Sequence, residues 1–370
     1  MITKQDLERL IERADGGRPV LSLFLDMSVN SDNKRTYNVF LNQKQAQFEE
    51  LDGSQAPAVA EAFDRVREWL VNEYDEANRG VVIYTELDGD WLEGLQFPVP
   101  VQNRAVLGSR PVITPLAQVI ESYHHHGVIL LDREHVRILS VYLGTLLDEL
   151  EVHGDPIPTP SDVQAGGYSQ ARLQRRKAEE MRHFFKEFAQ EVEAFVARYR
   201  PHDLVVLGTE ENTAKFLEFL PPQLREMVVY TGPAWVDDNC SEILQRIQPH
   251  LEAHEEQERL ETVALVRDRV AHDYLATAGI QGTLIALQEG KVDTLVIARD
   301  QQRDGVRCKQ CSFVFARELD ACPYCGSGTL EEVDAVEELV RMAEGQGVSI
   351  AFAEPNEVDD LKGVGALLRY

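Results

Sequence analysis

The sequence predicts a mixed α/β protein built from three domains. Short apolar runs with strand character alternate with longer segments in which apolar residues recur at helical spacing. The chain has 370 residues, 44% of them hydrophobic, which is more than one typical domain requires. Four of its five cysteines are crowded into one short stretch, which indicates a metal-binding insert. We expect the domains to span residues 1–117, 118–255 and 256–370.

The first segment is predicted to be an α/β domain. A short helical pattern precedes the strand Val20–Leu25, whose residues are almost all apolar. Pro57–Tyr74 is predicted to be a helix, because a proline opens it and apolar residues recur on one face. Gly80–Tyr84 indicates a buried strand, and Leu116–Tyr123, after a Thr-Pro pair, a helix that joins two domains.

The middle segment starts with a predicted hairpin of the strands Gly127–Leu131 and Val136–Tyr142. A polar stretch rich in glycine and proline, His153–Gln170, is predicted to be a long loop, and such loops are usually functional or disordered. From Ala171 to Arg200 there is neither glycine nor proline, and aromatic residues recur at helical spacing. This pattern predicts a long, well-anchored helix.

An alternating pattern continues to the end of the chain. Strands are expected at Leu204–Leu207 and Met227–Tyr230, with a helix after Thr209 between them. The charged helical stretch that follows is expected to break at Pro249. In the last segment we expect helices at Gly282–Leu287 and Val333–Ala343, and strands at Thr294–Ile297 and Val348–Phe352.

The composition favours a cytoplasmic protein without a membrane partner. No run long enough to span a membrane is free of charged residues, and the start lacks an apolar signal-peptide core. The formal net charge of −26 repels free nucleic acid, so DNA binding is not expected. A role on RNA would need a local basic patch.

The strongest local motif is a pair of CxxC sequences. Cys308 and Cys311 form the first and Cys322 and Cys325 the second, with the spacing of a zinc ribbon at 306–330. Zinc is the expected ion, with a rubredoxin-like iron site or redox-active thiols as alternatives. Four thiolates leave no open position for water, so the metal is expected to be structural. Cys240 has no partner in sequence and is expected to be a buried thiol.

A cluster of cations opens the predicted long helix. Its members are Arg172, Arg175, Arg176, Lys177 and, further along, Arg182. Cations at a helix N-terminus oppose the macrodipole, so something else has to favour them. One explanation is a solvated face that pairs with acidic surface, and the other is a patch that binds RNA phosphates.

The preceding loop carries Gly166, Gly167 and Gln170. Paired glycines let a backbone approach another surface closely, and a glutamine can hold a water molecule or a carbonyl group. The run His124–His126 is expected to be structural, because successive residues of an extended segment point to opposite faces.

Taken together, these segments resemble the archaeo-eukaryotic class-one release factors and Pelota, in the domain order of that family. The glycine loop before a basic helix carries the resemblance in the middle segment. In the last segment it rests on Gly282–Gly290, Val292–Ile297, the CxxC pair and the ending Gly363–Tyr370. The resemblance implies an N-terminal decoding-site domain, a ribonuclease-H-like middle domain and a ribosomal-protein-like C-terminal domain that meets an elongation-factor-type GTPase.

Two departures from the family pattern bear on activity. Tyr168 and Ser169 separate the glycine pair from Gln170, so the compact Gly-Gly-Gln tripeptide is replaced by a longer sequence. The first segment lacks an Asn-Ile-Lys-Ser motif, and Asn33–Arg35 is only a loose echo of it. We therefore do not expect stop-codon reading.

The resemblance leaves two hypotheses for a protein bound in the ribosomal A site. In the first, Gly166, Gly167 and Gln170 promote peptidyl-tRNA hydrolysis at the peptidyl-transferase centre and rescue stalled ribosomes, while the cations contact ribosomal RNA. In the second, the protein is a hibernation factor that fills the vacant A site and blocks the centre without chemistry. A free nuclease is not expected, because no acidic metal cluster stands out in the sequence.

Overall fold

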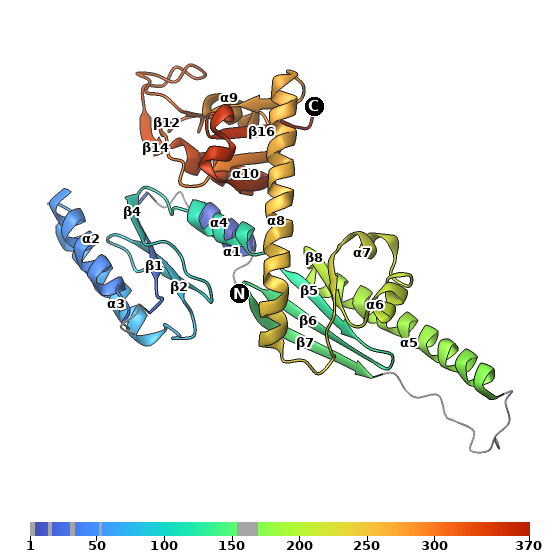
Figure 1. The fold of residues 1–370 in the computed structure, drawn as a ribbon. Helices are drawn as coiled ribbons and strands as arrows, with labels where there is room; N and C mark the ends of the chain where they lie inside the picture. The colour runs from blue at the N-terminus through green and yellow to red at the C-terminus, as the bar shows by residue number, and fades with distance from the viewer. Residues whose placement is uncertain (1–3, 14–16, 30–33, 52–53, 154–168) are drawn as a thin grey trace. The chain divides into compact units, whose positions relative to one another are not determined.

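The computed structural model describes residues 4–13, 17–29, 34–51, 54–153 and 169–370. The chain divides into two compact units (Figure 1). Unit 1 combines Met1–Ser122 with Glu256–Tyr370, and unit 2 is Tyr123–Glu255. The predicted mixed α/β class is confirmed, and among the described residues no helix has the length and apolar character needed to cross a membrane. The division into three domains stays a prediction.

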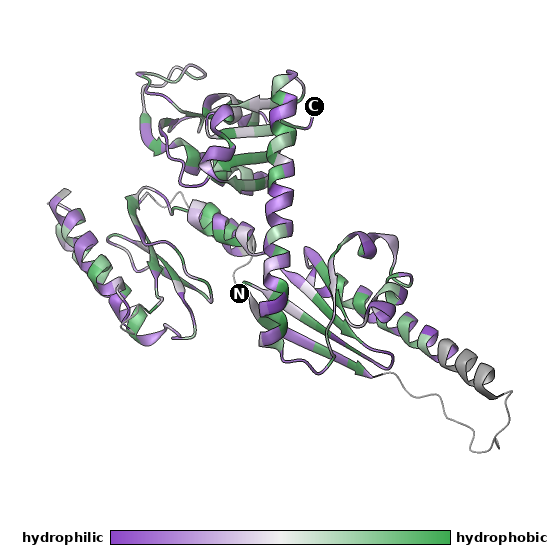
Figure 2. Ribbon diagram, in the orientation of Figure 1, coloured by the Kyte–Doolittle hydropathy of each residue, from purple (hydrophilic) through white to green (hydrophobic). Residues whose placement is uncertain are grey.

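The N-terminal part of unit 1 is an antiparallel sheet with the strand order β3-β2-β1-β4. Its elements are α1 (Lys4–Glu12), β1 (Val20–Asp26), α2 (Tyr37–Leu51), α3 (Ala56–Asn72), β2 (Gly80–Glu86), β3 (Leu92–Phe97) and β4 (Arg104–Gly108). Leu21, Leu23 and Leu25 of β1 pack against the apolar face of α3, which includes Phe63 and Val66. Figure 2 shows apolar and polar residues alternating along this helix, as an amphipathic surface helix requires.

The C-terminal part of unit 1 is a mixed sheet with the order β10-β16-β11-β15. Its elements are β10 (Ala276–Ala278), α9 (Ile280–Gln288), β11 (Val292–Ala298), α10 (Ala335–Gln346), β15 (Ser349–Ala353), two short 3-10 turns (Pro355–Glu357 and Asp359–Leu361) and β16 (Val364–Leu368). The glycine-bearing end is needed for packing. A Cβ at Gly365 would lie 2.9 Å from Cγ1 of Val266, and Gly363 has a φ of +80°.

Between β11 and α10 the chain forms a small three-stranded sheet, here called the cysteine ribbon (residues 304–334). Its strands are β12 (Asp304–Cys308), β13 (Val314–Phe315) and β14 (Leu330–Asp334), in the order β13-β12-β14. This is the insert that the cysteine spacing predicts.

The two parts of unit 1 are joined through α10. The carboxylate of Glu337 accepts hydrogen bonds from the backbone N–H groups of Ile113 and Thr114, at 2.7 and 3.0 Å, and from the Thr114 hydroxyl at 2.6 Å. These donors lie at the start of α4 (Thr114–Ser122), and Arg341 donates to the Pro111 carbonyl in addition. The start of α4 is therefore held by a side chain from far along the sequence.

Unit 2 contains a five-stranded sheet with the order β7-β6-β5-β8-β9, in which β5, β8 and β9 are parallel and β6 is antiparallel to β5 and β7. Its elements are β5 (His126–Leu131), β6 (His135–Tyr142), β7 (Thr145–His153), α5 (Ser169–Tyr199), β8 (Asp203–Leu207), α6 (Glu210–Leu217), α7 (Pro222–Glu226), β9 (Val228–Gly232) and the first half of α8 (Cys240–Ala271). This is the ribonuclease-H-like sheet that the resemblance implies. One face packs against α5, α6 and α7, and the other against α8.

Several details differ from the sequence predictions. The helix α8 continues through Pro249, because this residue is exposed and the carbonyl group that loses its hydrogen bond can be solvated. The strand β7, whose side chains are mostly exposed, occupies a stretch for which no element is predicted. Finally, α10 begins at Ala335 because Asp334 caps it through the Val336 N–H, so Val333 belongs to β14.

Candidate functional site

The long helix α5 is anchored by an aromatic stripe. Phe184, Phe185, Phe188 and Phe195 are buried in the core shared with the sheet, and Phe185 makes an edge contact with Phe216 of α6 at 5.7 Å between ring centroids. The described core contacts of α5 begin at Met181. Twelve residues precede it in the helix, which at 1.5 Å per residue corresponds to roughly 18 Å of helix.

The predicted loop residues fall largely outside the described part of the chain. Gly166 and Gly167 lie outside the described residues. The helix begins at Ser169, so Gln170 belongs to its first turn, whereas the sequence predicts that the helix starts at Ala171. A backbone N–H in the first turn of a helix has no partner within the helix. The position of Gln170 therefore leaves its backbone N–H available as a donor.

The predicted cations are carried by the same helix. Arg172, Arg175, Arg176 and Lys177 lie in the first turns of α5, at positions where only the backbone is described. Arg182 and Lys186 are exposed, while Phe184 and Phe185 between them are buried. The described part of α5 therefore keeps its cations on the solvent side of the helix.

The structure brings the four predicted metal ligands together. Their sulfur atoms all lie within 4.8 Å of one another, and the Sγ–Sγ distances of Cys308 to Cys325 and of Cys311 to Cys322 are both 3.5 Å. This arrangement could hold one metal ion on four thiolates. The donor set suits zinc or iron, and it leaves no position for a substrate.

The two CxxC turns have the same backbone geometry. The carbonyl group of Cys308 accepts from Ser312 N–H at 2.9 Å, and that of Cys322 accepts from Gly326 N–H at 2.8 Å. The backbone N–H of Cys308 in turn donates to the Phe313 carbonyl group, and that of Cys322 donates to the Ser327 carbonyl group. Ser312 and Gly326 both have positive φ angles, 62° and 75°. The turns are therefore preformed to present their sulfur atoms to a common point.

Backbone donors also favour ionised sulfur in this cluster. The N–H of Cys311, above all, lowers the pKa of the Cys308 thiol, to about 6. Burial alone would raise the pKa of Cys322, but N–H groups of Cys325 and Tyr324 lower it. Since the thiolate is the metal-binding form, these hydrogen bonds prepare the site for a cation.

Two glutamines of α9 attach the cysteine ribbon to the C-terminal sheet domain. Gln288 accepts from the Val314 N–H at 2.7 Å and donates to the Val314 carbonyl at 3.2 Å, as a neighbouring strand would. Gln281 accepts from the Ala316 N–H at 3.0 Å. Both residues flank or belong to the segment Gly282–Gly290 that carries the family resemblance, and the sequence alone does not reveal this contact.

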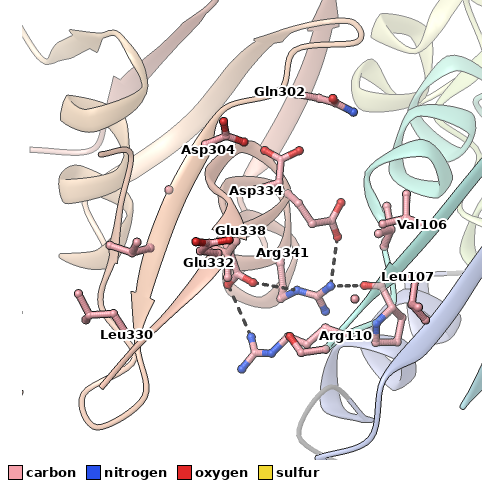
Figure 3. Close-up of a pocket in the computed structure, with 18 of the residues that line it drawn as sticks. Val106, Leu107, Arg110, Gln302, Asp304, Leu330, Glu332, Asp334, Glu338 and Arg341 are labelled. Atoms are coloured by element: carbon pink, nitrogen blue, oxygen red, sulfur yellow. Dashed lines mark hydrogen bonds and ion pairs between the residues drawn. The ribbon is translucent and has the colours of Figure 1, made fainter. Parts of the chain in front are cut away.

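A cavity of about 1130 Å³ lies within unit 1, between the β4 region and the elements β12, β14 and α10 (Figure 3). Carboxylates outnumber guanidinium groups along its walls. The acids are Asp304, Glu318, Asp320, Glu332, Asp334, Glu337 and Glu338, and the bases Arg104, Arg110 and Arg341. Burial raises the pKa of Glu338, whose carboxylate lies 3.6 Å from Nη1 of Arg110. This balance of charge disfavours phosphate, so we do not expect the cavity to bind RNA.

Two further sequence motifs have structural roles. Arg35, in the loose echo of the stop-codon motif, donates to the carbonyl groups of Met27 and Glu76. Asn33 lies outside the described residues. His125 is hydrogen bonded through its ring nitrogens to the Tyr199 carbonyl, at 3.0 Å, and to the Ser140 hydroxyl, at 2.8 Å, so this histidine is structural, as expected.

Comparison with known proteins shows what parts of this chain are similar to. Residues 111–255 match the model of bacterial archaeo-eukaryotic release factor family 10. Peptide chain release factor subunit 1 of Thermococcus kodakarensis is 25% identical over 311 residues, which cover 74% of this chain and 73% of the relative. The same factor of Methanocaldococcus jannaschii is 26% identical over 292 residues, or 70% and 69% of the two chains.

Solved structures of an archaeal termination factor and of a termination-like factor also align with this chain. A crystal structure of the archaeal termination factor aRF1 aligns with 100% of this chain and 99% of its own, at 16% identity and a TM-score of 0.28. Dom34 of S. cerevisiae, described as a termination-like factor interacting with Hbs1, covers 80% and 81% at 10% identity and a TM-score of 0.44. The chain is therefore similar to bacterial archaeo-eukaryotic release factor family 10 over residues 111–255, and to an archaeal peptide chain release factor over 74% of its length.

Proposed function

We propose that this protein binds the ribosomal A site and releases the peptide from stalled ribosomes by promoting hydrolysis of peptidyl-tRNA. The main support for the proposal is the way in which α5 is anchored and the residues that it bears. Its second half is fixed by buried phenylalanines, and its first turns hold Gln170 and four clustered cations at the far end. The archaeal relatives are named as peptide chain release factors, which supports the same function.

The cations give this end of α5 a reason to approach RNA. The whole chain has a formal net charge of −26, so attraction to phosphate has to be local. Arg172, Arg175, Arg176 and Lys177 supply it without an acidic residue among them, and Arg182 is exposed further along the helix. Each cation that neutralises a phosphate releases a counterion, which favours binding to ribosomal RNA.

In this proposal the chemistry depends on positioning. Gly166 and Gly167 permit a close approach of the backbone to the tRNA end. The backbone N–H of Gln170, or its side-chain amide, then orients a water molecule for attack on the ester. Ordered donors of this kind also stabilise the oxyanion that develops during the reaction.

One observation favours a second candidate, a hibernation factor that blocks the vacant A site without chemistry. Tyr168 and Ser169 separate Gly167 from Gln170, and the helix already begins at Ser169. Gln170 is therefore held by a helical turn and is less free than a glutamine placed directly after two glycines. A blocking protein needs only to occupy the vacant A site, and a loop that continues directly into a helix is sufficient for that.

The cysteine site, the first segment and the C-terminal part would have separate roles. We assign zinc to the four cysteines as a structural ion. The first segment would face the decoding site, and the C-terminal part would meet an elongation-factor-type GTPase. These assignments follow the family resemblance, and the first two can be tested by metal analysis and by ribosome footprinting.

The deciding experiment measures release of labelled peptide from ribosomes that hold peptidyl-tRNA and an empty A site. The wild-type protein should release peptide, and Gln170→Ala should release it more slowly while it still sediments with ribosomes. Gly167→Val should be more severe, because a β-branched residue is excluded from backbone conformations that glycine permits. Tight sedimentation of the wild type without any release would overturn the hydrolysis proposal and support the blocking one.

A further inference from the structure

Unit 2 contains a second cluster of metal-ligating side chains. His124, His202 and Asp203 each offer one ligand atom, and these three atoms lie within 4.8 Å of one another. Glu255 adjoins them, with its Oε1 3.7 Å from Nδ1 of His124. The His124 and His202 rings stack at 4.1 Å between centroids. The cluster thus combines two imidazoles with two carboxylates.

The fold fixes these residues from three separate elements. His124 comes just before β5, His202 and Asp203 are at the start of β8, and Glu255 is on α8. Since β5 and β8 are parallel neighbours, their first residues His126 and Asp203 are paired in register. The backbone N–H of His202 also donates to the His125 carbonyl at 2.7 Å. Strand pairing therefore places the imidazoles and the carboxylate together at one edge of the sheet.

Buried atoms in this cluster lack the hydrogen bonds that burial normally demands. Asp203 is only 4% exposed, yet within the described residues its Oδ2 has no hydrogen-bond partner. The same holds there for Nδ1 of His124 and Nδ1 of His126, and the latter faces Asp203 Oδ2 at 3.4 Å. A buried polar atom without a partner is costly, and coordination of a cation removes that cost for a carboxylate oxygen or an imidazole nitrogen.

We propose that His124, His202 and Asp203, with Glu255 beside them, form a second metal site that takes a borderline dication such as Zn²⁺. Imidazole with carboxylate suits zinc, cobalt or nickel, whereas Mg²⁺ and Ca²⁺ prefer oxygen ligands alone. An imidazole binds a metal through a ring nitrogen, in the plane of the ring. The His202 side chain, which is 47% exposed, therefore rotates away from its stacked position on His124 when the ion binds. The ion then ties the start of β5 and β8 to α8.

His126 acts as a positioning residue in this site. Its ring lies between the two carboxylates, with Nδ1 3.4 Å from Asp203 and Nε2 3.5 Å from Glu255. It is 6% exposed and cannot readily move aside. A group that orients a ligating carboxylate typically changes metal affinity by about 10–100-fold when it is replaced.

The test uses full-length protein whose cysteine site is already loaded with zinc. Calorimetric titration with ZnCl₂ should reveal one further ion per chain, and that ion should raise the melting temperature. His124→Ala and His202→Ala should each abolish the further binding, and His126→Gln should weaken it by about 10–100-fold. MgCl₂ should give no binding.

His183→Ala is the matched control, because His183 is an exposed histidine of unit 2 beside a glutamate, with Nδ1 3.6 Å from Glu187. It should bind the second ion like the wild type. If His124→Ala fails to fold, His202→Ala provides the test, because the His202 side chain is half exposed and its replacement should be tolerated. A wild-type chain that takes up no further zinc, or a His202→Ala chain that takes it up unchanged, overturns the proposal. As a second readout, Co²⁺ at this site should lack the sulfur-to-metal absorption bands of the thiolate site.

Discussion

The core beneath α5 and the core of the cysteine ribbon stabilise their surroundings by different means. Beneath α5, five phenylalanines, among them Phe184, Phe188 and Phe216, are buried together with aliphatic side chains of the strands β5, β6 and β8. In the ribbon the buried cluster has four members, Val306, Cys308, Phe315 and Cys322, and two of these are predicted metal ligands. Unit 2 can rely on apolar burial, whereas we expect the ribbon to need an ion.

This difference explains where each region places its functional groups. A large apolar core can hold a helix whose first turns carry no described core contact. The ribbon has too little apolar surface for that, so its shape depends on the thiolates and on hydrogen bonds from α9.

Removing the metal should affect the ribbon most. A structural zinc site in a small peptide contributes about 10–16 kcal/mol to folding, so chelation or Cys322→Ser should unfold residues 304–334. Hydrogen exchange should show loss of protection in β12, β13 and β14 while the β5–β8 strands stay protected. Equal loss of protection in the sheet of unit 2 would contradict the idea that the two regions are stabilised independently.

Truncating an aromatic residue should affect unit 2 and spare the ribbon. Phe188 is fully buried against Phe184 and Phe185, so Phe188→Ala should lower the free energy of unfolding by about 3–5 kcal/mol. Denaturant titration followed by circular dichroism measures this. Lys186→Ala, an exposed change on the same helix, is the control and should be nearly neutral. A similar cost for both variants would mean that the stripe does not anchor α5.

Removing the Gln288 amide should loosen the ribbon without releasing its metal. Gln288→Ala deletes the two hydrogen bonds to Val314 and leaves the N–H of this buried residue without its acceptor, at a cost of about 1–3 kcal/mol. Hydrogen exchange should accelerate in β13, with unchanged zinc content. Gln257→Ala removes an exposed glutamine that donates to Glu261 on α8, and it should change neither quantity.

Replacing the cations of α5 should have the smallest effect on stability. The same change should have a large effect on ribosome binding. Replacing Arg172, Arg175 and Arg176 by Ala should change the free energy of unfolding by no more than about 0.5 kcal/mol, as is usual for surface positions. Co-sedimentation with ribosomes should fall and should depend less steeply on salt. Sedimentation like that of the wild type at physiological salt would identify the cations as a solvated face only.

The sequence predicts the elements whose apolar pattern is strong. The strand Val20–Leu25, the stripe of α5 and the glycine-bearing end all appear where periodicity and glycine chemistry indicate them. The exposed edge strand β7 is not predicted, because strands with little burial have no apolar alternation to reveal them. The break expected at Pro249 is wrong for a related reason, since the effect of a proline on a helix depends on solvent exposure that only the fold determines.

The candidate sites show the same division. Four cysteines in two CxxC pairs reveal a metal site from spacing alone, and the structure brings them together. The cluster of His124, His202 and Asp203 is not predicted from the sequence, because strand pairing joins residues that are far apart. One cue does exist, a His-Asp pair directly before a buried strand together with a run of histidines before a neighbouring strand. The roles of Gly166 and Gly167 stay a prediction.

The hydrogen bonds from Ile113 and Thr114 to Glu337 have a consequence for how the protein is made. A growing chain folds its earlier domains first as they leave the ribosome. Here the start of α4 waits for an acceptor on α10, so the complete unit 2 is synthesised before the two halves of unit 1 can meet. Nascent chains that end before Glu337 should therefore keep the β4–α4 junction open to proteases, and chains long enough to expose α10 should close it.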